Sequence, residues 1–483
     1  MSRRPVRVCM AVVLMGVPLA LGACGSKAAS SASPTASHSA GPAANGAKSG
    51  TPPSGKPPTG TAPSGAPSGA PPGGQSGGQS GGAGGTTAAY TATGTYTLSG
   101  GSATKSGVAI SATVADRSAV LVKKSGSLKL VKTTIKKSGD SKSLDGSSFY
   151  GLNAGILAES AAKIVISGGS VTTTGAGANG VFAYGSGASI VMADATIKAT
   201  AQGGHGAMAS GGGSISLKNV NINTAGAAGA ALATDRGGGT VTAAGGTIRT
   251  SGMNSPGIYS TGVIKVSGAK ITASGAEAVV IEGSNSVVLK NTSASGAKNR
   301  GVMIYQSMSG DAAGAKGTFT MTGGALSAAA GPLFYVTNST GIITLANVTL
   351  TAHSGTLIDA APGAWGTSGS NGGVVKFTAT DEKLTGDVLT GTSSSISLNL
   401  KHASTLKGKI DKAALTLDAT SRWTVTANST LSALSDTSGI SGDVISNIIG
   451  NGHTVTYDAS LAANRLLGGK TYSLANGGRL MPS

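Results

Sequence analysis

Cysteine, aromatic side chains and acidic side chains are all scarce in this chain. Of its 483 residues, 2 are Cys, 18 are Asp or Glu, and Phe, Trp and Tyr together make up 3%. Two cysteines cannot build a disulfide framework, so packing and backbone hydrogen bonds must stabilise the fold. Few aromatic rings are present to stack on bases, so we expect no nucleic-acid partner. The 5 His are scattered and the carboxylates form no short-spaced cluster, so we also expect no metal and no cofactor.

The N-terminus has the pattern of an export signal. Three Arg precede an apolar run at residues 8–21, which is too short to span a bilayer and is followed by no stop-transfer charges. The sequence Leu-Gly-Ala-Cys at 21–24 resembles the lipobox of bacterial lipoproteins, in which the Cys is acylated and becomes the first mature residue. This resemblance implies a signal peptide over residues 1–23 and a lipid anchor on Cys24. The protein would then be extracytoplasmic, at the cell surface and attached to the membrane. An ordinary secretory signal with a coincidental Cys is the alternative, and the export route, general or twin-arginine, stays open.

Residues 24–88 form a second region of low complexity. They are almost entirely Gly, Ser, Pro, Ala and Thr. Such a segment has too few large apolar side chains to offset the entropy lost on ordering. We therefore predict a disordered tether between the lipid anchor and the rest of the protein.

The remaining chain contains an internal repeat, in which a small residue is followed by two or three apolar ones. Successive repeats start 25, 26, 24, 27, 21, 23 and 31 residues apart. They begin at Gly155, Gly180, Gly206, Ala230, Gly257, Ala278, Gly301 and Pro332. The longest interval contains residues 310–317, which we interpret as a surface insertion.

Each repeat also contains two short segments in which apolar and polar residues alternate, such as 164–166 and 171–173. Alternation bounded by Gly, Asn or Asp is typical of β-strands. Three strands in about two dozen residues predict an all-β fold, a right-handed, three-sided parallel β-helix. We expect about a dozen coils over residues 89–438, followed by a C-terminal cap at 439–483.

This pattern resembles the right-handed parallel β-helix repeat proteins of bacterial surfaces, both the pectin-lyase-like group and the passengers of adhesins. The resemblance covers about residues 90–436 and depends on periodicity and on Gly, Thr and Asn content. It implies a fold and not a site. The tripeptide Gly-His-Gly at 204–206 is shared with polygalacturonases, but their other motifs have no counterpart, so we interpret it as a turn.

The strand that opens each repeat is apolar on both faces. If Ile156, Val181 and their equivalents point into the core, a second apolar column points outward. Its members are Leu157, Phe182, Met208, Leu232, Tyr259, Val280, Met303 and Phe334. A strand that is apolar on both sides needs cover on both. Two interpretations stay open: another part of this chain covers the column, for example the insertion near Gly310 or the C-terminal segment, or a partner molecule binds there.

Polar side chains flank the same strand at both ends. Stacked repeats would align them at intervals of about 5 Å and form a groove suited to a polysaccharide. The candidate groove residues are Tyr184, His205, Asp235, Arg236, Glu282, Tyr305 and Gln306. Asn179, Glu277, Asn299 and Arg300 precede the strand. Solvated turns are polar as well, so a row of turns without a ligand is the alternative.

We assign no catalytic residue from the sequence. We predict a non-catalytic, adhesin-like surface protein that binds a polymer or a protein partner along the β-helix. The alternative is an extracellular polysaccharide lyase or hydrolase with its cleft at Asp235, Arg236 and Glu282, because paired carboxylates carry such chemistry.

The net charge of +18 is concentrated in part between residues 123 and 142, where 7 Lys accompany a single Asp. Such a patch would attract teichoic acids, anionic headgroups or acidic glycans. A role in solubility alone is the other interpretation.

Overall fold

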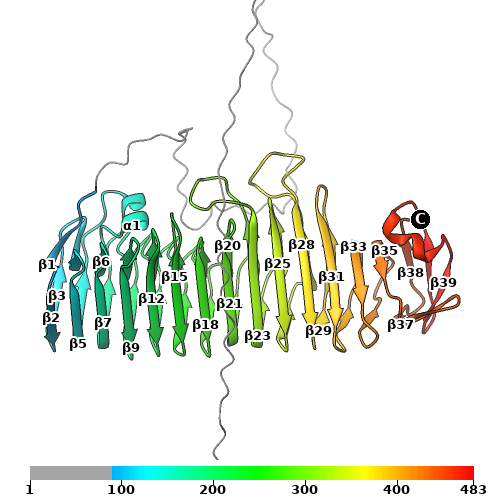
Figure 1. Ribbon diagram of the computed structural model, residues 1–483, viewed down its shortest axis with the longest axis horizontal. Helices are drawn as coiled ribbons and strands as arrows, with labels where there is room; N and C mark the ends of the chain where they lie inside the picture. Colours follow the sequence, from blue (N-terminus) through cyan, green and yellow to red (C-terminus); the bar gives the residue numbers. More distant parts are fainter. Residues whose placement is uncertain (1–89) are drawn as a thin grey trace, which may run out of the picture. The chain divides into compact units, whose positions relative to one another are not determined.

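The computed structural model describes residues 90–483 (Figure 1). The predicted signal peptide at 1–23, the predicted lipidation site Cys24 and the predicted tether at 24–88 lie outside the described residues. Within residues 90–483 the chain forms 40 strands, one α-helix and one short 3-10 helix. The strands pair in parallel with two exceptions, which lie near the C-terminus. The prediction of an all-β chain built from parallel strands is confirmed.

Each strand pairs with the corresponding strand of the repeats before and after it. For example, β8 (Val181–Tyr184) pairs with β6 (Ile156–Glu159) on one side and with β11 (Ala207–Ser210) on the other. Repeats that follow one another in the sequence are therefore neighbours in space, and we call each repeat a coil (Figure 1). The pairings collect the strands into three ladders that run across the coils.

The first ladder contains the strand that opens each coil. It comprises β1 (Thr93–Ser99), β4 (Arg117–Lys123), β6, β8, β11, β14 (Leu232–Thr234), β17 (Ile258–Ser260), β20 (Val279–Glu282), β22 (Val302–Tyr305), β24 (Phe334–Thr337), β27 (Thr356–Ala360) and β30 (Asp387–Thr390). It continues through β33 (Ile410–Leu417), β35 (Ser429–Ser435), β38 (Thr454–Tyr457) and β40 (Arg479–Pro482).

The second ladder follows the first along each coil. It comprises β2 (Ser102–Ser106), β5 (Ser127–Lys137), β7 (Lys163–Thr173), β9 (Ser189–Ala193), β12 (Gly213–Lys218), β15 (Gly239–Ala244), β18 (Val263–Ser267), β21 (Ser286–Gly296), β23 (Lys316–Ala328), β25 (Ser339–Ala346), β28 (Gly373–Thr380) and β31 (Ser395–Lys401).

The third ladder closes each coil and shares the long strands β5, β7, β21 and β23 with the second. Its other strands are β3 (Ala109–Ala112), β10 (Thr196–Ala199), β13 (Asn221–Thr224), β16 (Thr247–Thr250), β19 (Lys270–Ala273), β26 (Thr349–Ala352), β29 (Lys383–Thr385), β32 (Thr405–Lys407), β34 (Arg422–Thr424), β37 (Val444–Ile449) and β39 (Tyr472–Ala475).

Residues 439–483, for which we predict a cap, continue the parallel pairing and add other elements. β38 pairs with β35, and β40 pairs with β38. The two antiparallel pairs join β36 (Ile440–Ser441) to β37 and β39 to β40. The 3-10 helix η1 (Ala462–Leu467) lies between β38 and β39 in the sequence.

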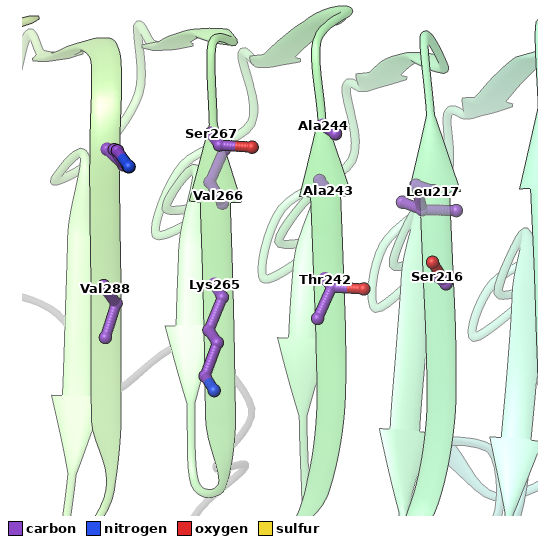
Figure 2. A pocket seen from close by; sticks show the side chains of 10 residues that line it. Ser216, Leu217, Thr242, Ala243, Ala244, Lys265, Val266, Ser267 and Val288 are labelled. Atoms are coloured by element: carbon purple, nitrogen blue, oxygen red, sulfur yellow. The ribbon is translucent and has the colours of Figure 1, made fainter. Parts of the chain in front are cut away.

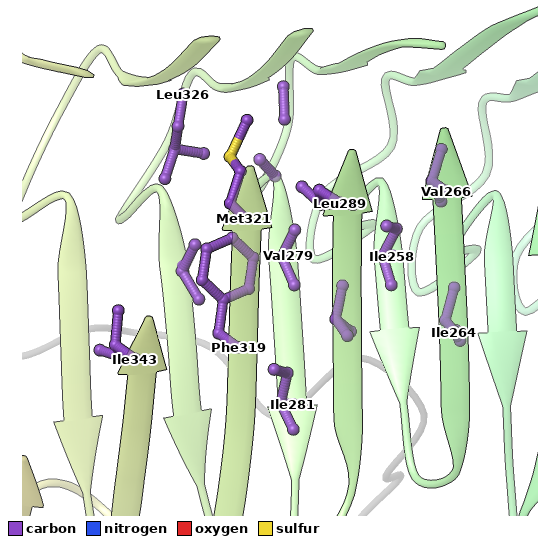
Figure 3. Packing of buried hydrophobic residues seen from close by; sticks show 14 of the residues in the cluster. Ile258, Ile264, Val266, Val279, Ile281, Leu289, Phe319, Met321, Leu326 and Ile343 are labelled. Carbon is purple, nitrogen blue, oxygen red and sulfur yellow. The ribbon is translucent and has the colours of Figure 1, made fainter. Parts of the chain in front are cut away.

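Alternation along the second ladder separates the core from the surface. In β12, Ser214, Ser216 and Lys218 are exposed, whereas Ile215 and Leu217 are buried. Figure 2 shows outward side chains on neighbouring strands, among them Ser216, Thr242 and Lys265. The inward side chains of the three ladders form one continuous, mainly aliphatic core. Figure 3 shows part of it, with Ile258 and Val279 of the first ladder beside Ile264, Leu289 and Phe319 of the second.

The turn between the second and third ladders requires a left-handed backbone. Asp194, Asn219 and Gly245 occupy this position in three successive coils, with φ of 52°, 52° and 67°. Asn and Asp tolerate this conformation and Gly adopts it freely. The Asn219 side chain also donates a hydrogen bond to Asp194 Oδ1 at 3.2 Å. The turn geometry therefore explains why Gly, Asn and Asp bound the alternating segments.

The glycine at the start of a coil is needed because the next coil lies so close. A Cβ added to Gly180 would be 2.5 Å from the Gly206 carbonyl oxygen and 2.4 Å from Ile197 Cγ2. A Cβ added to Gly206 would be 2.5 Å from the Ala231 oxygen and 2.4 Å from Ile222 Cγ2. Backbone contact between coils thus accounts for glycine at these two positions, whereas the equivalent positions of other coils accommodate Ala231, Ala278 and Leu333.

We expect Gly206→Ala to lower the free energy of unfolding by about 1–3 kcal/mol, because the added methyl group overpacks this contact. Gly268→Asn is the matched control: Gly268 has φ of 61° with nothing within 4 Å, and Asn accepts that backbone. Urea unfolding followed by circular dichroism measures both changes. If Gly206→Ala is as stable as the wild type, the coils are not in this close contact.

Candidate functional site

The structure divides the predicted groove residues among three places. One group gathers at the carboxyl ends of first-ladder strands, beside the 306–315 loop that joins β22 to β23. Its members are Asp235, Arg236, Glu282, Tyr305 and Gln306. Tyr184, at the end of β8, packs with its ring centroid 5.4 Å from that of Tyr150 in α1 (Leu144–Tyr150). His205 precedes β11 and so lies at the other end of the strands.

Glu282 is the centre of the first group. Its carboxylate accepts hydrogen bonds from the hydroxyl of Tyr259 at 2.5 Å and of Tyr305 at 2.8 Å, and from the hydroxyl of Ser307. Burial raises the pKa of both tyrosines well above the usual value, so the phenols stay protonated and remain donors. Glu282 therefore links three consecutive coils to the first residues of the 306–315 loop.

Arg236 holds the same loop from an earlier coil, and Asp235 precedes it in the sequence. Burial, with a further contribution from the nearby Asp311 carboxylate, raises the pKa of Asp235 well above its usual value. Arg236 Nη2 forms an ion pair with Asp311 Oδ1 at 2.7 Å. The Arg236 guanidinium also lies 3.9 Å from the centre of the Phe149 ring in α1. Arg236 thus contacts both segments that cover this end of the first ladder.

Apart from Arg236, whose side chain is 48% exposed at the edge, this group is a closed cluster and not a groove. Asp235, Glu282, Tyr305 and Gln306 are each at most 4% exposed. A polysaccharide chain cannot contact them while the 306–315 loop is in place. The carboxylates of the alternative enzyme, Asp235 and Glu282, are equally inaccessible to a substrate in this structure.

His205 is buried among polar backbone groups. Its backbone N–H donates to Asn179 Oδ1 at 2.9 Å, and Asn179 Nδ2 in turn donates to the Ser147 carbonyl in α1 at 3.1 Å. His205 is 2% exposed, and burial lowers its pKa to about 4, so the imidazole is neutral at neutral pH. Its position links coils and offers no contact to a ligand.

The outward column of the first ladder differs from the predicted one at two positions. Leu232 pairs with Ala207 and Phe334 pairs with Val302, which places both side chains in the inward core cluster. Ala233 and Tyr335 occupy the outward positions instead. The runs Ala-Ala-Leu-Ala and Leu-Phe-Tyr are apolar in either phase, so hydrophobicity alone does not fix which residue points inward. Leu157, Phe182, Met208, Tyr259, Val280 and Met303 lie in the outward column as predicted.

Segments of this same chain cover the outward column, which decides between the two open interpretations. The end of α1 lies on it: a Cβ at Gly151 would be 2.6 Å from the Phe182 ring and 2.9 Å from Leu157 Cδ1. The 361–372 loop between β27 and β28 covers a later part, where Trp365 and Tyr305 have ring centroids 4.7 Å apart. Every predicted member of the column is buried, so it offers no surface to a protein partner.

An open cleft remains on the first ladder beyond the covered part. Its volume is about 720 Å³, and it is lined by Asn299, Arg300, Gly331, Pro332, Tyr335, Asp359 and residues 361–364. Tyr335 and Asp359 are register partners on β24 and β27, so they occupy the outward column in consecutive coils. The column therefore changes from apolar to polar where the cover ends.

Arg300 is held at the wall of the cleft by two contacts. Its Nη1 forms an ion pair with Glu277 Oε1 at 3.2 Å, and its guanidinium lies 4.2 Å from the centre of the Tyr335 ring. Both hydrogen bonds of this guanidinium within residues 90–483 use Nη1, which leaves donors of Nε and Nη2 for a ligand. Burial raises the pKa of Asp359, and the positive charge of Arg300 offsets part of this effect.

The cleft thus presents a carboxylate acceptor, guanidinium donors and an aromatic side chain. Arg300 and Glu277 come from the polar residues that precede the strand, as the sequence indicated. Tyr335 was missed because Phe334 was assigned to the outward column in its place, and Asp359 belongs to the coil after the last repeat identified in the sequence. The apolar pair Leu357 and Ile358, one coil after Phe334, is the signal that could have revealed it.

No protein-family model, curated protein or solved structure matches this chain. Within residues 90–483, no group of three or more His, Asp or Glu side chains is arranged to hold a metal ion. No helix in that part of the chain is long and apolar enough to cross a membrane.

We expect the buried carboxyl of Asp235 to make stability fall as the pH rises. Its pKa is raised in the folded protein, so between the ordinary value near 3.8 and the raised value the unfolded chain ionises and the folded chain does not. Asp235→Asn keeps the acceptor for the Arg236 N–H at 2.7 Å but removes the titration. Urea midpoints should be similar at pH 4 and higher for Asp235→Asn than for the wild type at pH 8. A variant that is less stable at pH 8 would show that the ionised carboxylate stabilises the cluster.

Proposed function

We propose that this chain is a non-catalytic, extracytoplasmic binding protein that holds a polysaccharide segment in the cleft of Arg300, Tyr335 and Asp359. Its scaffold would be a right-handed, three-sided parallel β-helix, like those of pectin-lyase-like proteins and adhesin passengers. A lipid on Cys24 and a disordered tether would attach it to the outer surface of the membrane. The three parallel ladders support the scaffold, and the open cleft supports the ligand.

The chemistry of the cleft favours an uncharged, hydroxyl-rich ligand. Arg300 is already neutralised by Glu277, and Asp359 would repel an anionic group. A carboxylate accepts hydrogen bonds from sugar hydroxyls, and the remaining guanidinium donors reach hydroxyl or ring oxygens. Pro332 and the part of Tyr335 that lines the cleft supply apolar contact for the carbon skeleton. A volume of about 720 Å³ is within the usual range of ligand sites.

A binding role is favoured over catalysis because the paired carboxylates are not available together in the open cleft. Asp235 and Glu282 are buried under the 306–315 loop. Glu277 is committed to Arg300. A protein partner is disfavoured because the apolar column that would have bound it is covered by this chain.

The observation that carries the proposal is the position of Asp359 in the cleft, and Asp359→Asn tests it. A glycan array with the full chain identifies the ligand, and calorimetry then compares variants. We expect Asp359→Asn to weaken binding by about tenfold or more, because charge-assisted hydrogen bonds to the ligand are lost. Asp443→Asn is the control, since Asp443 is exposed and its one ion pair within residues 90–483, with Lys470 at 3.7 Å, is exposed as well.

If Asp359→Asn binds the glycan with unchanged affinity, the glycan does not bind in this cleft. Release of reducing sugar from a bound glycan would contradict a non-catalytic role and favour the lyase or hydrolase alternative. If no glycan on the array binds, the proposed ligand class is wrong.

A further inference from the structure

Positive charge is concentrated on two of the three ladders. The fourteen strands of the second and third ladders from β5 to β26 contain twelve Lys or Arg and no Asp or Glu. The acidic residues of these coils lie instead in the first ladder, its flanking segments and the turns, as with Asp194, Glu277 and Glu282. In these coils the positive charge therefore lies mainly on the second and third ladders.

One of the twelve cations, Lys137, belongs to the interior. Its Nζ donates to the carbonyl oxygens of Val114 at 3.2 Å and Gly139 at 2.5 Å, and burial lowers its pKa. The other eleven side chains are exposed. They form what we call the basic surface: Lys129, Lys132, Lys136, Lys163, Lys198, Lys218, Arg249, Lys265, Lys270, Lys290 and Lys316.

The parallel register sets part of the basic surface at a regular spacing. On the third ladder, Lys136 and Lys198 are both register partners of Thr172, and Lys198 and Arg249 are both register partners of Asn223. Over these five coils a cation therefore occurs on every second coil, with a hydroxyl or an amide between, and the column continues as Thr272, Ser295 and Ser327. Adjacent strands are about 4.8 Å apart, so these cations are about 10 Å apart.

A shallow hollow lies on the second ladder within the same surface (Figure 2). Its volume is about 200 Å³, and Lys265 and Lys290 line it together with hydroxyl-bearing Ser216, Thr242 and Ser267. Ammonium groups beside hydroxyl donors are the groups that bind phosphate oxygens at protein surfaces.

We propose that the basic surface binds a linear polymer with repeated phosphate groups, laid across successive coils. Charge complementarity and the alternating row of Lys136, Lys198 and Arg249 favour a polymer with a regular charge spacing over a bilayer, which needs only a clustered patch. Lysine ammonium groups bind phosphate as point charges and need no fixed geometry, which suits a flexible polyol-phosphate chain. This site is separate from the Arg300 cleft and does not depend on the proposed glycan ligand.

The test uses the full chain, poly(glycerol phosphate) as the probe, and dextran as the uncharged control polymer. We expect saturable binding to the phosphate polymer that weakens strongly between 0.1 and 0.5 M salt, since screening shortens to a few ångströms. The triple variant Lys136→Gln, Lys198→Gln and Arg249→Gln should lose about tenfold in affinity.

The matched control removes the same charge elsewhere on the described chain. Lys412→Gln, Arg465→Gln and Arg479→Gln change three exposed residues of the C-terminal coils, and this variant should bind within about twofold of the wild type. Equal losses in the two triple variants would show that net charge alone acts, which overturns the proposal.

Vesicles containing anionic phospholipid separate the polymer from a membrane. Binding to vesicles without binding to the polymer would also overturn the proposal. Asp359→Asn should bind the phosphate polymer like the wild type, so a failed glycan cleft and a failed basic surface give different results. Loss of polymer binding in Asp359→Asn would place the polymer in the cleft and contradict a separate site.

Discussion

Backbone hydrogen bonds between successive coils determine where every side chain of residues 90–483 lies. They favour glycine at the start of several coils, because the carbonyl of the next coil would approach to within 2.5 Å of a Cβ at positions such as Gly206. They also require a left-handed residue such as Asn219 between the second and third ladders. Once these two conditions hold, residues about one coil apart become lateral neighbours. Residues that are far apart in the sequence thereby form continuous columns on the surface of each ladder.

The columns explain how one repeating fold presents three different surfaces. On the second and third ladders, outward positions are solvated and basic. On the first ladder, the outward positions are apolar and are covered by α1 and by the 306–315 and 361–372 loops. Glu282 fixes the 306–315 loop through tyrosine and serine hydroxyls, and Arg236 fixes it through Asp311. Where this cover ends, Tyr335 and Asp359 face the open cleft.

The sequence was sufficient for the strands and their parallel stacking, because alternation and glycine-led repeats record local requirements. The sequence also predicted that Asp235 and Glu282 lie at the same end of the strands that open the coils. The sequence did not predict that Asp235 and Glu282 are buried. The loop that covers them is held by contacts such as that of Arg236 with Asp311, which are 75 residues apart in the sequence. The prediction of the outward column was wrong only where neighbouring residues are all apolar, as at Leu232, since a hydrophobic side chain points inward there in either phase.

The most direct test of this account is disulfide trapping between coils. Thr172 and Lys198 are register partners on β7 and β10, whereas Thr172 and Asn223 are two coils apart. Cα atoms must lie within about 7 Å for a disulfide, and strands two apart are separated by about 10 Å. We predict that Thr172→Cys with Lys198→Cys forms a crosslink under mild oxidation, seen by peptide mass spectrometry, and that Thr172→Cys with Asn223→Cys does not. Failure of the first pair, or equal crosslinking of both, would contradict the stacked register.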